Sequence, residues 1–220
     1  MPTLRLIRKV EIFLEVLMLK KCSFLLISFF IGIVVGLATV FGQKYLPGAL
    51  NSLANSGSVW VVPAFYIAKS YKQKWKSIIS SMIYLLICVI TYYGYYSISW
   101  KIGFTIGFHQ AIWLCCAVIF GFIFGLGGNI SQYGKGTIKY LCKVMLPATF
   151  LSESLMLISH FQQYSHMLDV IFMWFFIGIS LYFINCKKEW YSKHYLLALL
   201  IMLSLGFLGY QLIYYSDVFA

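Results

Sequence analysis

The sequence predicts an all-α protein, a polytopic bundle of about seven transmembrane helices, and three observations support this fold class. Hydrophobic residues make up 61% of the 220-residue chain and charged residues 10%, too few to cover a soluble globule. The apolar residues form continuous runs of about 20, which in hydrocarbon favour helices over a barrel. Fifteen of the seventeen Lys and Arg residues fall in four loops and tails that alternate with nearly uncharged ones. This alternation is typical of basic loops retained on the cytoplasmic side.

The first 21 residues predict a basic amphipathic segment on the inner membrane face, because apolar residues recur at helical spacing among five Lys and Arg residues. A poorly ordered leader is the alternative, and Met18 is a second candidate for the true start. We expect no cleaved signal peptide, since the apolar run from Cys22 to Phe41 is too long. Residues 22–220 are predicted to form one transmembrane domain, because no loop is long enough for a soluble module.

The first span, residues 22–41, contains Gly32 and Gly36, a spacing that lets another helix approach closely. The second span is predicted to be short and broken, because Val59–Ala68 contains a proline and reaches only about 15 Å, half of the hydrocarbon core. It must nevertheless cross, since the lysines after it would otherwise lie outside. The Asn- and Ser-rich residues 49–55 are therefore predicted to enter the membrane as its outer part.

Five spans of ordinary length are predicted from the remaining apolar runs. They cover residues 77–96, 103–127, 138–158, 167–185 and 195–215. The turns after the second, fourth and sixth spans are basic, so the amino terminus is predicted inside and the carboxyl terminus outside. The fifth span is the most polar, and its Glu153 lies too deep to reach the inner surface.

Charge and motifs weigh against several function classes. The net charge of +11 does not indicate nucleic-acid binding, because the basic residues sit at span ends, beside anionic lipid headgroups. The six cysteines are scattered and the histidines lack metal-ligand spacing, so we expect no disulfide framework, metal site or cofactor. No zinc-protease, nucleophile-elbow or phosphate-loop motif occurs, and an enzyme therefore ranks below binding or transport.

Polar residues near the outer ends of several spans predict a ligand site. Glu153 and His109 are each expected about 8 to 9 Å below the outer end of a span, and such groups usually have a task or a partner. Carboxamides lie at similar or shallower depth, so we predict an outward-facing polar cavity for a small solute. Its predicted ligand-binding residues are Glu153, His109, Gln110, Asn51 and Asn55. Its candidate aromatic walls are Trp60, Tyr92, Trp113 and Trp174.

Two other interpretations of these groups stay open. Glu153 protonated or paired with His109 would simply fix helix packing, because polar residues also hold transmembrane helices together. The same pair could instead relay protons.

The stretch GQKYLPGALNSLANSGSVWVVPAF, residues 42–65, resembles the hallmark of a bacterial family of small multi-pass membrane proteins defined only as a domain of unknown function. The resemblance implies a protein of the bacterial cytoplasmic membrane and no particular activity. In architecture the chain also resembles the substrate-binding subunits of energy-coupling-factor vitamin transporters. Those subunits are small all-helical membrane proteins with an outward-facing ligand cavity, but they have six spans where this sequence predicts seven.

The leading hypothesis is a non-enzymatic membrane protein that binds or helps transport a small solute. A structural or regulatory accessory subunit, or an immunity-type subunit, is the alternative, and it would dock other membrane subunits through its glycine-containing faces. An intramembrane enzyme is the third hypothesis. In all three, the lipid bilayer is the main partner.

Overall fold

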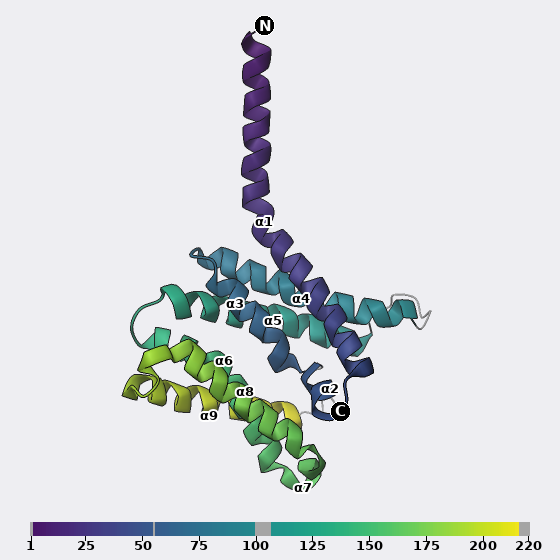
Figure 1. Ribbon diagram of the computed structural model, residues 1–220, viewed down its shortest axis with the longest axis vertical. Coiled ribbons are helices and arrows are strands. Elements are labelled where there is room, and N and C mark those ends of the chain that lie inside the picture. Colours follow the sequence, from purple (N-terminus) through teal and green to yellow (C-terminus); the bar gives the residue numbers. More distant parts are fainter. Residues whose placement is uncertain (1, 55, 100–106, 216–220) are drawn as a thin grey trace.

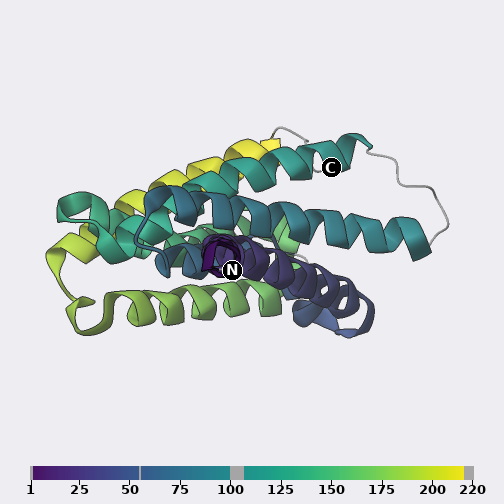
Figure 2. The same ribbon diagram turned by 90° about the horizontal axis from the view of Figure 1, so that it is seen from above.

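The computed structural model describes residues 2–54, 56–99 and 107–215, and it confirms the all-α fold (Figure 1). Its helices are α1 (Pro2–Tyr45), α2 (Gly48–Ala54), α3 (Gly57–Lys69), α4 (Lys74–Ser99), α5 (Phe108–Tyr133), α6 (Gly136–Ser159), α7 (Phe161–Tyr164), α8 (Leu168–Cys186) and α9 (Lys193–Tyr215). Short 3-10 turns, Ser165–Met167 and Lys187–Glu189, precede and follow α8. Most of the long helices run along a common direction (Figure 2).

Within the described residues, six helical segments are long and apolar enough to cross a membrane. They are Phe24–Tyr45, Lys74–Ser99, Phe108–Tyr133, Gly136–Ser159, Phe161–Cys186 and Lys193–Leu212. The protein is therefore an integral membrane protein. One boundary differs clearly from the prediction, because the fourth predicted span, residues 103–127, becomes α5, which begins at Phe108 and ends at Tyr133.

The amino-terminal part of α1 extends away from the bundle as a continuation of the first span (Figure 1). The predicted segment 1–21 is thus helical from Pro2 onward. Its side chains lie outside the described part of the chain, so its amphipathic face stays a prediction.

Helices α1 and α4 pack in parallel, which fixes the path of the segment between them. A Cβ atom on Gly32 would meet the carbonyl oxygen of Tyr84 at 2.7 Å, and one on Gly36 would meet that of Cys88 at 2.7 Å. Residue numbers therefore rise together along both helices. Since α1 ends where α4 ends, α2 and α3 must return the chain across the bundle. This return matches the short, broken second crossing that the sequence predicts.

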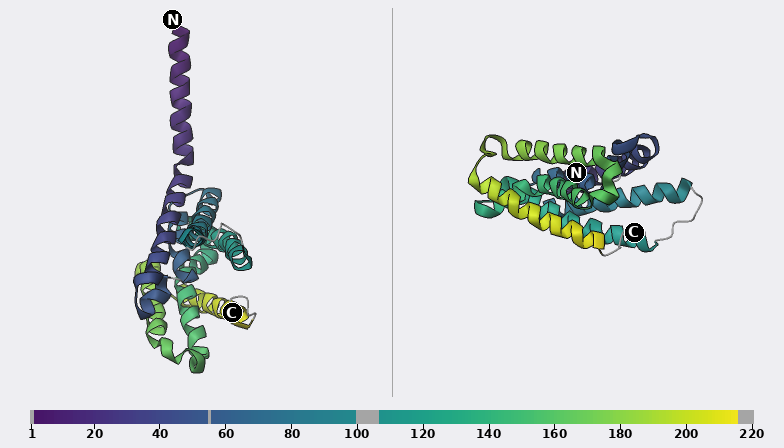
Figure 3. Two further views of the ribbon diagram at one scale, coloured as in Figure 1. Left: turned by 90° about the vertical axis from the view of Figure 1, so that its right-hand side faces the viewer. Right: turned by 90° about the horizontal axis from the view of Figure 1, so that it is seen from below.

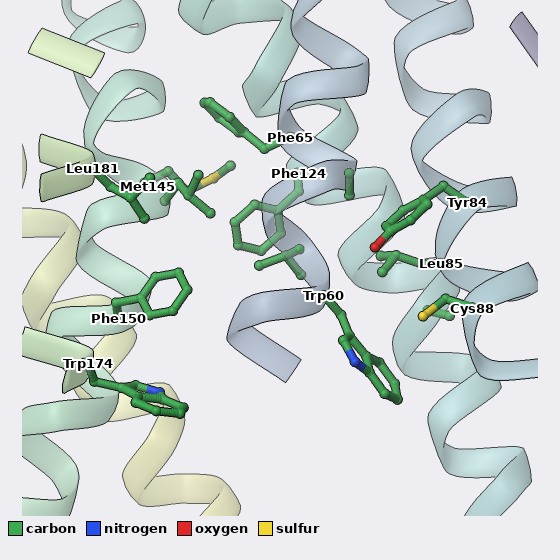
Figure 4. Close-up of a cluster of buried hydrophobic side chains, with 14 of the residues drawn as sticks. Trp60, Phe65, Tyr84, Leu85, Cys88, Phe124, Met145, Phe150, Trp174 and Leu181 are labelled. Atoms are coloured by element: carbon green, nitrogen blue, oxygen red, sulfur yellow. The ribbon is translucent and has the colours of Figure 1, made fainter. Parts of the chain in front are cut away.

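The short helix α3, of 13 residues, lies in the centre of the bundle, and small residues let its neighbours approach. Ser81 of α4 donates a hydrogen bond to the carbonyl of Ala64 at 2.7 Å. A Cβ atom on Gly128 of α5 would collide with the carbonyl oxygen of Phe65. Aromatic and aliphatic side chains pack around α3 to form the hydrophobic core (Figure 4). They include Trp60, Phe65, Tyr84, Phe124, Phe150 and Trp174.

A second parallel pair, α6 and α9, follows in the other half of the chain. Lys143 donates to the hydroxyl of Tyr195 at 2.7 Å, and Ser152 donates to the carbonyl of Leu203 at 3.0 Å. Helix α8 connects them in sequence and runs antiparallel to α6, because Ser154 bonds the carbonyl of Ile171 while Gly178 lies against Leu151. The molecule thus contains two similar units, α1 to α4 and α6 to α9, which α5 connects. Helices α2 and α3 are not among the six candidate membrane spans, where the sequence predicts about seven.

The three lysine-rich turns gather at one end of the bundle. Asn129 at the end of α5 donates to the carbonyl of Tyr71 at 2.7 Å, in the turn between α3 and α4. Lys69 in turn reaches Asn185 at the end of α8, at 3.4 Å. We call this the basic end, and its orientation toward the cytoplasm stays a prediction of the positive-inside rule.

Candidate ligand-binding cleft

A cavity of about 740 Å³ lies between α3, α5, α6 and α9 in the half of the bundle away from the basic end. Nearly all of its wall is apolar. Side chains of the wall include Trp60, Trp113, Phe120, Phe124, Met145 and Met202. Its size falls in the range of about 300 to 1,000 Å³ that is usual for small-molecule sites.

The rims of the cavity are α5 and α9, which lie on the side of the molecule away from α1 (Figure 3). Helix α5 packs mainly on α3, α4 and α6, and α9 packs mainly on α6, so the two rims are not sealed against each other. Lining residues at the rims are exposed, Ile123 to 43% and Leu205 to 59%. A Cβ atom on Gly209 would have no neighbour within 4 Å. The cavity is therefore a cleft that opens sideways, where lipid chains surround a membrane protein.

A polar cluster closes one end of this apolar cleft. The carboxylate of Glu153 on α6 accepts hydrogen bonds from Ser58, from Tyr210 at 3.2 Å and from Ser56 at 3.5 Å. The Ser58 and Tyr210 hydroxyls also bond each other at 2.6 Å. Three helices thus contribute to the cluster, and Glu153, Ser56, Ser58 and Tyr210 all line the cleft.

Local sequence explains why the amino terminus of α3 faces this carboxylate. Ser56 is the N-cap of α3, and its hydroxyl accepts from the backbone N–H of Ser58 at 3.2 Å. The partial positive charge of a helix amino terminus stabilises a carboxylate beside it. On the other side, the absence of a side chain at Gly206 lets α9 approach Ser152, one residue before Glu153. The indole nitrogen of Trp174 also lies near the carboxylate, without a hydrogen bond of normal geometry.

Of the five predicted ligand-binding residues, Glu153 lines the cleft. His109 is exposed on the first turn of α5, where its ring meets Phe108 edge-on. Gln110, also on that turn, folds toward Gly107. Neither residue lines the cleft, and both lie at the helix end because α5 begins later than predicted.

The predicted Asn residues lie in a different place. Asn51 of α2 donates from its amide to the carbonyl of Gln43 in α1 at 2.5 Å, across the turn between the two helices. Asn55 lies outside the described residues. Two of the predicted aromatic walls, Trp60 and Trp113, do line the cleft, and their rings lie 5.5 Å apart. Tyr92 packs behind them on Trp60 at 5.9 Å.

The sequence did not predict Ser56, Ser58 or Tyr210 as site residues. The serines had a usable signal, because a Ser before an apolar helix is a typical N-cap. Tyr210 had none, since its place beside Glu153 follows from the packing of α9 on α6. Among the described residues, no group of three His, Cys, Asp or Glu side chains is placed to hold a metal ion.

Comparison with known proteins gives a family but no activity. Neither a curated protein nor a solved structure matches the chain, so the architectural resemblance to energy-coupling-factor subunits stays an expectation. One family model covers residues 18–216, and it includes every helix of the bundle and the whole cleft. The chain belongs to this family of unknown function, DUF6518.

Proposed function

We propose that the protein binds an amphipathic, lipid-like molecule in the cleft between α5 and α9, without catalysing a reaction on it. The observation that carries this proposal is the arrangement of one polar cluster at the end of an apolar cleft open toward lipid. An apolar chain would lie along Trp113, Phe120 and Leu205, and the polar group would reach Glu153. Such a molecule could enter from the bilayer without leaving hydrocarbon.

The hydrogen-bonding chemistry of the cluster restricts which headgroup the ligand can carry. Glu153 is an acceptor, and none of its hydrogen bonds in the described residues comes from a basic side chain. A headgroup with an amine or hydroxyl donor would add a charge-assisted hydrogen bond to this carboxylate. We therefore propose an amine- or hydroxyl-bearing amphiphile as the ligand class, in the outer half of what the family resemblance suggests is a bacterial cytoplasmic membrane.

Thermal stability of the purified protein tests this proposal. The probes are single-chain amphiphiles of equal chain length with amine, hydroxyl or carboxylate headgroups, added to protein in a neutral detergent. We expect amine and hydroxyl probes to raise Tm in a saturable manner, because a ligand that binds only the folded state stabilises it. The carboxylate probe should give no saturable shift, since like charges repel at Glu153.

Two variants locate the binding. Glu153→Gln should weaken binding of the amine probe at least about tenfold, by removing the charge-assisted bond. Gly209→Phe should abolish binding of all probes by filling the cleft, whereas Leu208→Phe, on the exposed neighbouring residue, should leave it intact. Equal binding in the parent and Gly209→Phe proteins would refute the proposal. A stoichiometric membrane partner without any ligand-induced shift would favour the accessory-subunit hypothesis instead.

A further inference from the structure

Three lysines converge at the basic end, opposite the cleft. Lys69 ends α3, Lys143 lies on the second turn of α6, and Lys187 follows α8, so they come from three separate parts of the chain. Lys143 and Lys187 both lie within electrostatic range of Lys69. The backbone of Lys187 has a φ of 52°, a left-handed conformation that lysine rarely adopts.

Two of these ammonium groups donate hydrogen bonds to neutral side chains. Lys69 donates to the Asn185 carboxamide oxygen at 3.4 Å, and Lys143 donates to the Tyr195 hydroxyl at 2.7 Å. Both lysines are half-buried. A carboxylate, Glu189, lies close to Tyr195 and offsets part of the charge. Three ammonium groups against this one carboxylate leave the cluster with excess positive charge.

Asn185 adds an unsatisfied donor at the same place. Its side chain is 3% exposed, and its oxygen accepts from both Lys69 and Tyr66. These two donors fix the orientation of the amide, which leaves the buried Nδ2 without a hydrogen-bond partner in the described part of the chain. A buried donor without an acceptor is uncommon and calls for an explanation. An anion seated among the lysines, with a small adjustment of the amide, would supply the acceptor.

We infer that the cluster of Lys69, Lys143, Lys187 and Asn185 binds a phosphate group at the cytoplasmic face. Phosphate oxygens match three ammonium donors and one amide donor, and charge-assisted bonds of this kind are the stronger ones. The height of the cluster, at the ends of α3, α6 and α8, is that of lipid headgroups in the inner leaflet. Lys72 and Lys74, at the same end, are exposed like Lys187, whereas Lys69 and Lys143 are half-buried.

The test compares lipids and free phosphate on the full-length protein in neutral detergent. Phosphatidylglycerol and phosphatidylcholine are added separately, Tm is followed, and native mass spectrometry counts retained lipids. We expect a saturable rise in Tm and one retained lipid with phosphatidylglycerol. We expect neither with phosphatidylcholine, because the lysines would repel the quaternary ammonium next to its phosphate. Inorganic phosphate forms the second arm. A saturable shift with phosphate alone would indicate a soluble phosphate compound, whereas a shift with phosphatidylglycerol alone would indicate a headgroup.

Matched variants distinguish anion binding at this site from a general attraction of anions to the positive charge of the basic end. Lys69→Gln combined with Lys143→Gln should weaken anion binding at least about tenfold, since two charge-assisted bonds are lost. Lys72→Gln combined with Lys74→Gln removes the same charge from exposed positions and should change binding less than about twofold, because exposed charges are screened. An equal loss in both pairs would overturn the proposal.

A further variant decides the question even if the first pair fails to fold. Asn185→Asp keeps the volume of the side chain and supplies a carboxylate to Lys69, so it should replace the phosphate. We expect this protein to lose the shift with phosphatidylglycerol and with phosphate while its own Tm is at least that of the parent. Retention of an undiminished anion-induced shift in Asn185→Asp would contradict the site.

Discussion

The two parallel helix pairs of the molecule have the same orientation and different contacts. Where α1 packs on α4, Gly32 and Gly36 press against backbone carbonyls. Among the described side chains, the hydrogen bonds between the two helices lie at one end, from Tyr92 and Tyr96 to Gln43. Where α6 packs on α9, hydrogen bonds occur at every level. They join Lys143 to Tyr195, Ser152 to Leu203, Glu153 to Tyr210 and Ser159 to Gln211.

This difference shows how the two pairs are held together. Glycines bring the backbones of α1 and α4 into contact, whereas α6 and α9 combine one close contact, at Gly206 against Ser152, with side-chain hydrogen bonds between the helices. In the membrane-spanning part of α9, 11% of the residues are buried inside the molecule. The corresponding shares are 33% for α1 and 39% for α4. The cleft borders the α6–α9 pair. Helix α9 packs on α6 along one face, and the face that it turns toward α5 is left uncovered.

The largest expected effect comes from breaking the glycine-mediated pair. Gly36→Leu would force its Cβ atom to within 2.7 Å of the Cys88 carbonyl, a backbone atom that cannot move without moving α4. We expect a loss of about 3 kcal/mol or more in the free energy of unfolding. Equilibrium unfolding in mixed micelles measures it. Gly209→Leu is the matched control on α9, where the added side chain meets open space, and an equal loss in both would contradict the comparison.

A smaller effect is expected at the polar end of the cleft. Tyr210→Phe removes the hydroxyl that bonds both Glu153 and Ser58 and should destabilise the fold by about 1 kcal/mol. It should also raise the mobility of α9, seen as faster hydrogen exchange of its amides. Tyr215→Phe serves as the control, because Tyr215 is 72% exposed. Identical exchange of α9 in both variants would show that Tyr210 does not anchor this helix.

The features of the fold that each segment determines by itself, through its hydrophobic length and its charge, were predictable from the sequence. The broken crossing through α2 and α3 followed from hydrophobic length and from the lysines after it, and the parallel packing of α1 and α4 requires that crossing. The grouping of the basic turns followed from charge alone. These properties depend on the bilayer as a solvent, which acts on each segment separately.

The site was less predictable, because depth along a helix does not determine which way a side chain faces. Glu153 and His109 were expected at one level, yet only Glu153 lines the cleft. A start of α5 five residues later than expected carried His109 to the helix end. Tyr210 lies 57 residues from Glu153, and only the packing of α9 on α6 brings the two together.

The smallest expected effect tests the middle of the hydrogen-bonded pair. Ser152→Ala removes the bond to the Leu203 carbonyl, and hydrogen bonds between transmembrane helices contribute about 0.6 kcal/mol on average. The expected destabilisation is therefore near that value, well below that of Gly36→Leu, as measured by the same unfolding experiment. Ser204→Ala is the control, since the Ser204 hydroxyl bonds only within α9, to the Leu200 carbonyl. A loss for Ser152→Ala as large as that for Gly36→Leu would mean that the hydrogen-bonded pair is as tightly coupled as the glycine-mediated one. Several such hydrogen bonds join α9 to α6. Each bond therefore contributes little, and α9 keeps its position when a single bond is removed. The cleft therefore keeps its shape after a single loss and changes only when the polar contacts fail together.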